Sequence, residues 1–138
     1  MPEIDSELEL ALNYLDHNKD ESLKRLFDIL KIPSISTQEK YSKDCLNAAN
    51  WFVEQLQDIG FDASIRETNG HPMVVAHFEQ EGPHFLFYGH YDVQPIDPVE
   101  LWNHDPFEPK IEKSHNGEII KARGASDDKG QVMTFIEA

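Results

Sequence analysis

Apolar residues recur at helical spacing in the first third of the chain. A capping box opens at Ser6, with a glutamate three residues later, and the apolar residues that follow share one helical face: Leu8, Ala11, Leu12 and Leu15. A second helix is predicted from near Asp20, because another apolar set forms one stripe: Leu23, Leu26, Phe27 and Leu30. Pro33 is expected to end this helix, since proline lacks the N–H that the helix needs.

A third helix is predicted to end at Gly60, which occupies the position of a glycine C-cap. Its apolar face consists of Cys45, Ala48, Ala49, Phe52, Val53, Leu56 and Ile59. Because Cys45 lies on this stripe, we interpret it as a small core residue rather than a reactive thiol.

After Gly60 the apolar period becomes that of β-strands. Residues 63–68 and 73–78 flank Asn69-Gly70, a dipeptide that favours a β-hairpin. Residues 85–88, Phe-Leu-Phe-Tyr, are continuously apolar and predict a third strand that is buried on both faces of a sheet.

The last third of the chain predicts a loop, a hairpin and a helix. Residues 95–109 are rich in proline and predict an irregular loop with a functional role. Asn116-Gly117 predicts a second hairpin between Ile111 and Ile119-Ile120. A final helix is predicted from Gly130, with apolar residues at Val132, Met133 and Ile136.

Helices alternating with strands predict the α/β class, with a layered mixed sheet flanked by helices.

Composition narrows the range of partners. The 138 residues include 26 acidic and 12 basic side chains, for a formal net charge of −14. Such a charge repels phosphate backbones and anionic lipid, so we expect no nucleic-acid or membrane partner. No apolar run reaches the roughly 18 residues of a membrane span, and no secretory signal is visible. A single cysteine agrees with a reducing compartment, so we expect a cytoplasmic protein.

His90 and Asp92 directly follow the predicted buried strand. In open α/β sheets, ligands gather at the carboxyl ends of strands, and residues two apart in extended chain point to the same side. A metal-binding histidine usually donates its second ring N–H to a carboxylate. The pair therefore predicts a metal-binding histidine with its partner, and the alternative is a histidine that is only hydrogen-bonded in a loop.

Asp127 and Asp128 place two carboxylates side by side ahead of the final helix. Adjacent carboxylates repel, and a divalent cation compensates for this repulsion. One carboxylate can also bridge two metal ions at a spacing of about 3.5–4 Å. Two alternatives stay open: the pair can be an N-cap with a first-turn acid, or Lys129 and Arg123 can neutralise it without metal.

Together, three stretches resemble a known enzyme family. They are residues 90–95 (His-Tyr-Asp-Val-Gln-Pro), Trp102 with residues 105–107 (Asp-Pro-Phe), and residues 123–130 (Arg-Gly-Ala-Ser-Asp-Asp-Lys-Gly). In order and spacing they closely resemble the co-catalytic zinc metallopeptidases, the family that contains carnosinase-like dipeptidases, aminoacylase, acetylornithine deacetylase and carboxypeptidase G.

The resemblance covers essentially the whole chain. Residues 32–36 (Ile-Pro-Ser-Ile-Ser) resemble the opening of the family, and Val93-Gln94-Pro95 with Trp102 resembles its dipeptidase branch. Ala122 is a departure, because family members often carry glycine before the Arg-Gly pair.

The resemblance implies roles for three residues. His90 would ligate one zinc ion, Asp92 would be the catalytic-site carboxylate that clamps His90, and Asp127 would bridge two zinc ions. Cobalt or manganese are alternative metals. The Asp127–Asp128 peptide bond can be cis in such a site, and Asp128 is expected to shape the turn without a catalytic role. Solvated or hydrogen-bonded roles are expected for the other histidines: His17, His71, His77, His84, His104 and His115.

The resemblance also implies that residues 1–138 are the N-terminal portion of a zinc-peptidase catalytic domain, without the lid and dimerisation domain. The family's glutamate general base and further metal ligands have no match in the chain. We therefore expect zinc-dependent hydrolysis of dipeptide-like amide bonds by a parent enzyme, and no activity from this portion alone. The alternatives are an N-acyl amino acid deacylase or a carboxypeptidase on the same scaffold, or a non-catalytic interaction module. The expected partners are a small peptide or N-acyl amino acid substrate and a second subunit in a full-length homodimer.

Overall fold

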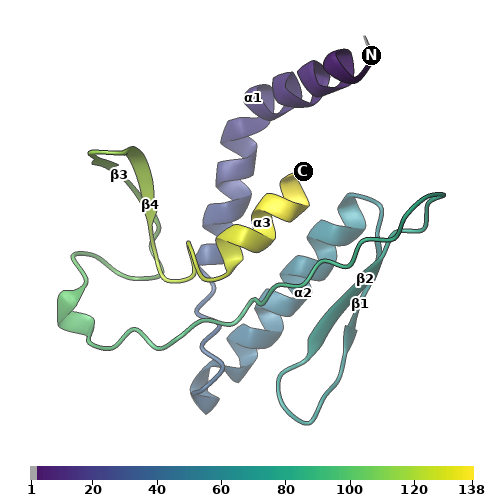
Figure 1. The fold of residues 1–138 in the computed structure, drawn as a ribbon. Coiled ribbons are helices and arrows are strands. Elements are labelled where there is room, and N and C mark those ends of the chain that lie inside the picture. The colour runs from purple at the N-terminus through teal and green to yellow at the C-terminus, as the bar shows by residue number, and fades with distance from the viewer. Residues whose placement is uncertain (1–2) are drawn as a thin grey trace.

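A computed structural model describes residues 3–138 of the chain (Figure 1). The helices and strands follow in the order α1 (Glu3–Leu30), α2 (Ser42–Asp58), β1 (Asp62–Arg66), β2 (Met73–His77), β3 (Lys110–Ser114), β4 (Gly117–Lys121) and α3 (Lys129–Glu137). Short 3-10 helices occur at Glu39–Tyr41 and Val99–Leu101. Within residues 3–138, no helix is both long and apolar enough to cross a membrane.

Helix α1 is one continuous helix, so the prediction of two separate helices is wrong. The polar residues between the two predicted helices include neither proline nor glycine, and therefore nothing there breaks the backbone. Local hydrogen bonds add support, since Asn18 Nδ2 donates to the Tyr14 carbonyl at 2.8 Å. The helix already runs from Glu3, so Ser6 does not mark its start. Its N-terminal end extends away from the rest of the fold (Figure 1).

Helix α2 ends at Asp58, and Gly60 follows as the helix-terminating glycine that the sequence predicts. Gly60 adopts a positive φ of 94°, the Gly60 N–H donates to Gln57 O, and the Phe61 N–H donates to Leu56 O. These two bonds form a Schellman motif, which reverses the chain into β1. The apolar face of α2 then packs with the β1–β2 hairpin and α3. The buried members of this core are Ile29, Ala48, Phe52, Leu56, Ala63, Met133 and Ile136.

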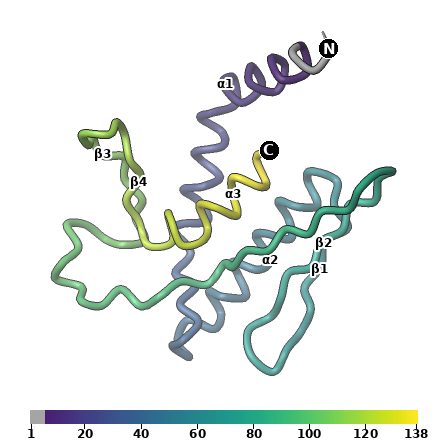
Figure 2. The backbone as a smooth tube through the Cα atoms, in the orientation of Figure 1, coloured from purple at the N-terminus to yellow at the C-terminus, as the bar shows by residue number. Residues whose placement is uncertain are grey.

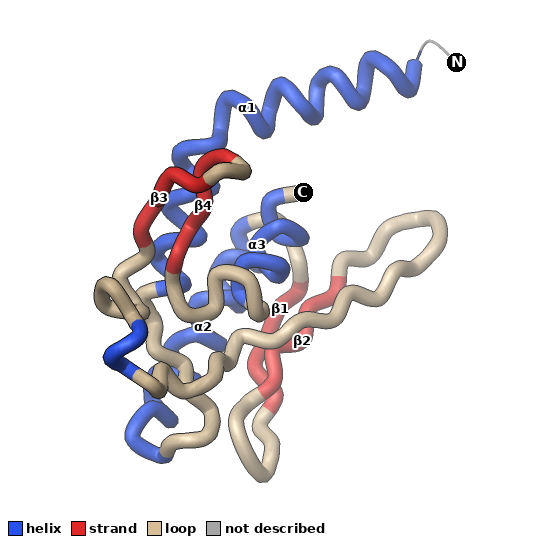
Figure 3. Tube along the Cα trace, turned by 60° about the vertical axis from the view of Figure 1, so that its left-hand side comes forward, coloured by secondary structure: helices blue, strands red, loops and turns tan. Residues whose placement is uncertain are grey.

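The strands form two separate two-stranded antiparallel sheets, as the two hairpin signals predicted. In the first, Asp62 pairs with His77 and Arg66 with Met73. In the second, the register runs from Lys110 opposite Lys121 to Ser114 opposite Gly117, whose φ of 105° suits only glycine well. The two hairpins lie apart in both views (Figures 1 and 3). The combination of helices and strands confirms the α/β class, but within residues 3–138 the strands form two separate antiparallel hairpins rather than one layered mixed sheet.

Residues 85–88 are extended but are not part of a strand, so the prediction of a doubly buried strand is wrong. Phe85, Leu86 and Tyr88 are 92%, 97% and 85% exposed. Within residues 3–138 no strand lies alongside to pair with this backbone, and its apolar side chains are left uncovered. The exception is Phe87, whose ring stacks on Phe135 of α3 at 4.1 Å. The segment crosses the fold between α2 and α3 (Figure 2).

Polar contacts made by Ser22, Arg25 and Lys129 tie α1 to α3, which lie at opposite ends of the chain. The Nε and Nη2 atoms of the Arg25 guanidinium group each donate a hydrogen bond of 2.6 Å to the Glu137 carboxylate. At the other end of α3, the fully buried Lys129 donates from Nζ to the carbonyls of Ile29 (3.1 Å) and Ile32 (2.6 Å). Burial lowers the pKa of Lys129 to about 7. Lys129 thus joins the last turn of α1 to the start of α3, next to the two aspartates.

The Arg25–Glu137 pair gives a stability prediction. Hydrogen bonding from Arg25 lowers the pKa of Glu137 below its ordinary value of 4.5. A carboxylate with a lowered pKa stabilises the fold above its unfolded-state pKa, and this contribution is lost as the pH falls through its folded-state pKa. Because Arg25 is partly exposed, we expect Glu137→Gln to lower the free energy of unfolding near neutral pH by only about 1 kcal/mol.

Urea unfolding, monitored by circular dichroism, measures this difference. The deficit of Glu137→Gln should shrink when the same titration is repeated at about pH 3. Glu54→Gln, at an exposed glutamate of α2, serves as the matched control and should match the wild type at both pH values. Equal stability of Glu137→Gln and wild type near neutral pH would contradict the prediction.

Candidate metal centre

His90 and Asp92 meet as the sequence predicts. The His90 Nδ1 atom lies 3.0 Å from Asp92 Oδ1 and 3.1 Å from the Asp92 carbonyl oxygen. The second carboxylate oxygen of Asp92 accepts a hydrogen bond of 2.5 Å from the Ser36 hydroxyl. Both oxygens of Asp92 are therefore engaged, which fixes the carboxylate against the histidine ring.

The loop after α1 holds this segment in place. The Val93 N–H donates to the Ser34 carbonyl at 2.9 Å, and the Ser34 hydroxyl donates to the Tyr91 carbonyl at 2.6 Å. Ile35 and Val93 form a parallel β-bridge between these hydrogen bonds. Ser34 and Ser36 were not predicted as site residues, because their role depends on contacts with residues more than fifty positions later. Only their place in a family-like stretch could have drawn attention to them.

Asp127 approaches His90 from the turn that precedes α3. Its Oδ1 atom lies 3.0 Å from His90 Nε2, although the two residues are 37 positions apart. The Asp127–Asp128 peptide bond is cis, as the resemblance implied. Gly130 closes this turn, since its N–H donates to Gly124 O and a Cβ at Gly130 would lie 1.9 Å from the Ala125 carbonyl oxygen. The Asp127 side chain is 78% exposed and is therefore accessible from solvent.

Asp128 is placed at the N-cap of α3, but its side chain makes no cap hydrogen bond. Instead, its Oδ2 atom accepts the backbone N–H of His90 at 3.0 Å. The alternative of an N-cap with a first-turn acid is therefore not met, because Asp128 occupies the N-cap position without capping the helix through its side chain and the first turn of α3 holds no acidic residue. Within residues 3–138, one group of histidine, cysteine or acidic side chains could hold a metal: His90, Asp127 and Asp128, whose ligand atoms all lie within 4.8 Å of one another.

The protonation of His90 follows from these contacts. When Nδ1 carries its proton toward Asp92, the Nε2 atom of the neutral ring is a lone-pair acceptor that faces another acceptor, Asp127 Oδ1. A cation, either a proton or a metal ion, is needed between them. Burial lowers the pKa of His90, but hydrogen bonding to Asp92 and Asp127 outweighs burial, so the pKa lies above its ordinary value of 6.5.

The donor set fits a divalent metal such as zinc. It offers one imidazole nitrogen and carboxylate oxygens, which are common zinc ligands, and the second nitrogen of the ring is already held by a carboxylate. Lys129 and Arg123 do not neutralise the aspartates directly in the structure. Lys129 donates to the carbonyls of Ile29 in α1 and of Ile32 just after it. Arg123 donates to the Pro95 carbonyl and lies over the Trp102 ring.

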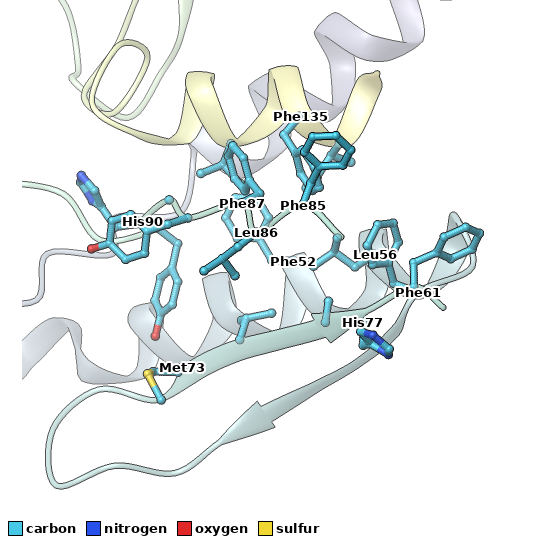
Figure 4. Close-up of a pocket in the computed structure, with 18 of the residues that line it drawn as sticks. Phe52, Leu56, Phe61, Met73, His77, Phe85, Leu86, Phe87, His90 and Phe135 are labelled. Carbon is cyan, nitrogen blue, oxygen red and sulfur yellow. The ribbon is translucent and has the colours of Figure 1, made fainter. Parts of the chain in front are cut away.

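A mainly apolar groove of about 1040 Å³ leads away from this centre. His90 lies at one end of the groove, and Phe61 and His77 lie at the other (Figure 4). Its walls come from α2, the β1–β2 hairpin, α3 and the exposed segment 85–88. His90, one member of the candidate metal group, therefore borders a groove that is open to solvent.

Several of the other histidines make the hydrogen-bonded contacts that were predicted for them. His71 Nε2 lies 2.8 Å from Ser36 O, and His104 Nε2 lies 3.2 Å from Lys121 O. His17 Nδ1 lies 2.6 Å from Asn13 O. None of these three lies in the candidate metal group of the described residues.

Comparison with known sequences identifies a family match in the second half of the chain. Residues 86–138 match Peptidase family M20/M25/M40. The Cys-Gly metallodipeptidase DUG1 of Candida albicans is 29% identical over 144 residues, which cover 94% of this chain and 29% of the relative. The succinyl-diaminopimelate desuccinylase of Alkalilimnicola ehrlichii is 38% identical over 86 residues, which cover 62% of this chain and 22% of the relative.

Solved structures extend the likeness to the fold. The crystal structure of human carnosine dipeptidase 1 superposes with a TM-score of 0.78 and 25% sequence identity. The match covers 94% of this chain and 29% of the human chain, so the chain spans less than a third of the length of this protein. The resemblance to a metallopeptidase family that the sequence predicts is therefore confirmed, and the chain corresponds in sequence and in fold to part of the larger family members.

Proposed function

We propose that His90 and Asp127 ligate a divalent metal, zinc by preference, within a peptidase that hydrolyses dipeptide-like amide bonds. The observation that carries the proposal is the 3.0 Å approach of His90 Nε2 to Asp127 Oδ1 while Asp92 holds Nδ1. His90 Nε2 and Asp127 Oδ1 are then two acceptor atoms that face each other, and together they supply two of the ligands of a cation site. Cobalt and manganese remain alternatives for the same donors.

Each residue has a distinct task in this proposal. Asp92 accepts the Nδ1–H of His90, so Nε2 keeps its lone pair for the metal. Asp127 offers a carboxylate that is exposed toward solvent, from which substrate would arrive. Bound at these donors, a divalent metal supplies Lewis acidity for the polarisation of an amide carbonyl. In a two-metal centre, Asp127 would be the carboxylate that both ions share.

We also propose that residues 1–138 are the N-terminal portion of a catalytic domain and are inactive alone. A zinc ion in a catalytic site takes about three protein ligands, and a two-metal site therefore requires more donors than His90, Asp127 and Asp128 provide. Amide hydrolysis also requires a general base within hydrogen-bonding reach of the attacking water. The share of the dipeptidase relative that the chain covers, 29%, leaves room for these groups in the rest of a longer protein.

Dipeptides are the substrate class that we favour. The similarity to the Cys-Gly metallodipeptidase extends over 94% of the chain, whereas the similarity to the desuccinylase extends over 62%. The second relative is nevertheless 38% identical where it matches, which supports an N-acyl amino acid deacylase as the second candidate. The carboxypeptidase and interaction-module alternatives have no such support. A full-length homodimer and a cytoplasmic location also remain proposals, the latter supported by the free, buried Cys45.

Metal binding by the chain tests the site. We expect zinc to bind weakly, with a dissociation constant on the order of micromolar or above, because too few donors are present for a complete shell. His90→Ala should weaken binding at least about tenfold, since it removes the only imidazole donor of the described metal group. Isothermal titration calorimetry measures both constants.

The matched control is His115→Ala, at an exposed histidine of the β3–β4 turn, and it should leave zinc affinity unchanged. Nanomolar zinc affinity in the wild type would contradict the incomplete site. An equal loss of affinity in the two variants would contradict the assignment of His90 as the ligand.

Turnover tests the proposed reaction. Residues 1–138 loaded with zinc should hydrolyse neither dipeptides nor N-succinyl amino acids above the background rate. A full-length protein that contains the chain should hydrolyse Cys-Gly-like dipeptides with at least about tenfold higher kcat/KM than N-succinyl amino acids, and Asp127→Ala should reduce both reactions to background. Zinc-dependent hydrolysis by residues 1–138 would refute the inactive-portion proposal, and a preference for N-succinyl substrates would favour the deacylase.

A further inference from the structure

We infer that Asp128 is a positioning residue: it holds the backbone of His90 against the turn that carries Asp127, and it is not itself a metal ligand. The inference rests on the proposed metal site, because it assigns the role of a third residue there. Asp128 lies close enough to His90 and Asp127 to be counted with the candidate ligands, and the inference gives its carboxylate a different role.

The hydrogen bonding of Asp128 is the first observation. An N-cap aspartate ordinarily accepts an N–H from the first turn of its own helix. Asp128 is the N-cap residue of α3 but makes no such bond, and its Oδ2 atom accepts the His90 N–H at 3.0 Å. The side chain is therefore used to connect two segments that are 38 residues apart, rather than to stabilise the helix end.

The close packing of Gly89 is the second observation. A Cβ atom placed on Gly89 would lie 3.2 Å from Asp128 Oδ2 and 2.5 Å from Cγ2 of Val132. The backbone before His90 thus lies directly against the start of α3, and a side chain at position 89 would require Val132 to shift. This contact keeps the His90 N–H within reach of the Asp128 carboxylate.

These contacts fix His90 from two sides. Asp92 orients the ring through Nδ1, and Asp128 holds the main chain through the peptide N–H. The Nε2 atom of His90 is then directed at Asp127, which directly precedes Asp128 in the sequence. Since Asp127 and Asp128 are joined covalently, the hydrogen bond of Asp128 couples the position of the His90 backbone to that of Asp127. Loss of this bond would loosen the separation of the two proposed ligands.

Two substitutions separate positioning from ligation. Asp128→Asn keeps an oxygen that can accept the His90 N–H but removes the negative charge that a ligand would use. Asp128→Ala removes both. Asp105→Ala is the matched control, because Asp105 Oδ1 accepts the Phe107 N–H at 2.9 Å in a loop outside the candidate metal group.

Two measurements are made on the wild type and the three variants: hydrogen exchange of the His90 amide by NMR, and zinc affinity by calorimetry with zinc chloride. Asp128→Ala should exchange the His90 amide at least about tenfold faster and bind zinc about 10- to 100-fold more weakly, as for other residues that orient a ligand. Asp128→Asn should stay within about threefold of the wild type in both, and Asp105→Ala should match the wild type.

Zinc binding by Asp128→Asn that is as weak as that of Asp128→Ala would overturn the inference and make Asp128 a ligand. Unchanged exchange and affinity in Asp128→Ala would overturn it by showing no role. If Asp128→Ala does not fold, Asp128→Asn decides alone: retained protection and affinity support positioning, and a tenfold loss of affinity contradicts it. If the wild type binds no zinc, the proposed metal site fails, while the His90 amide exchange rates of the variants still decide whether Asp128 positions His90.

Discussion

The His90 imidazole is held between two carboxylates, and the candidate site depends on this arrangement. One ring nitrogen lies 3.0 Å from Asp92, and the other lies 3.0 Å from Asp127. Because a neutral imidazole can donate only one proton, a further proton or a metal ion is needed between Nε2 and Asp127. The same geometry that would be unfavourable without a cation provides a nitrogen and an oxygen donor for a divalent metal.

The rest of the fold brings the two halves of this arrangement together. The loop after α1 holds the Asp92 side through Ser36, whose hydroxyl donates to the carboxylate. The Asp127 side is held by Lys129, whose buried ammonium group joins the start of α3 to the end of α1. The end of α1 and the loop that follows it therefore support both halves, although neither contributes a residue to the candidate metal group.

Local signals in the sequence predicted much of this structure. The hairpins follow from Asn-Gly dipeptides, the end of α2 from Gly60, and the convergence of His90 with Asp127 from the family resemblance. The sequence was misleading where structure depends on distant contacts or on their absence. Helix α1 continues because its polar middle lacks a breaking residue, and residues 85–88 remain exposed because no strand of the described chain pairs with them. The roles of Ser36 and Asp128 depend on partners more than thirty residues away.

Long-range proton–nitrogen NMR of the His90 ring tests the central claim most directly, because it observes each ring nitrogen separately. The account predicts that Nδ1 keeps its proton, hydrogen-bonded to Asp92, in both the metal-free and zinc-titrated protein. It also predicts that added zinc shifts the Nε2 resonance and leaves Nδ1 almost unchanged. A zinc-dependent shift of Nδ1, with the proton on Nε2, or no response of either nitrogen to zinc, would contradict it.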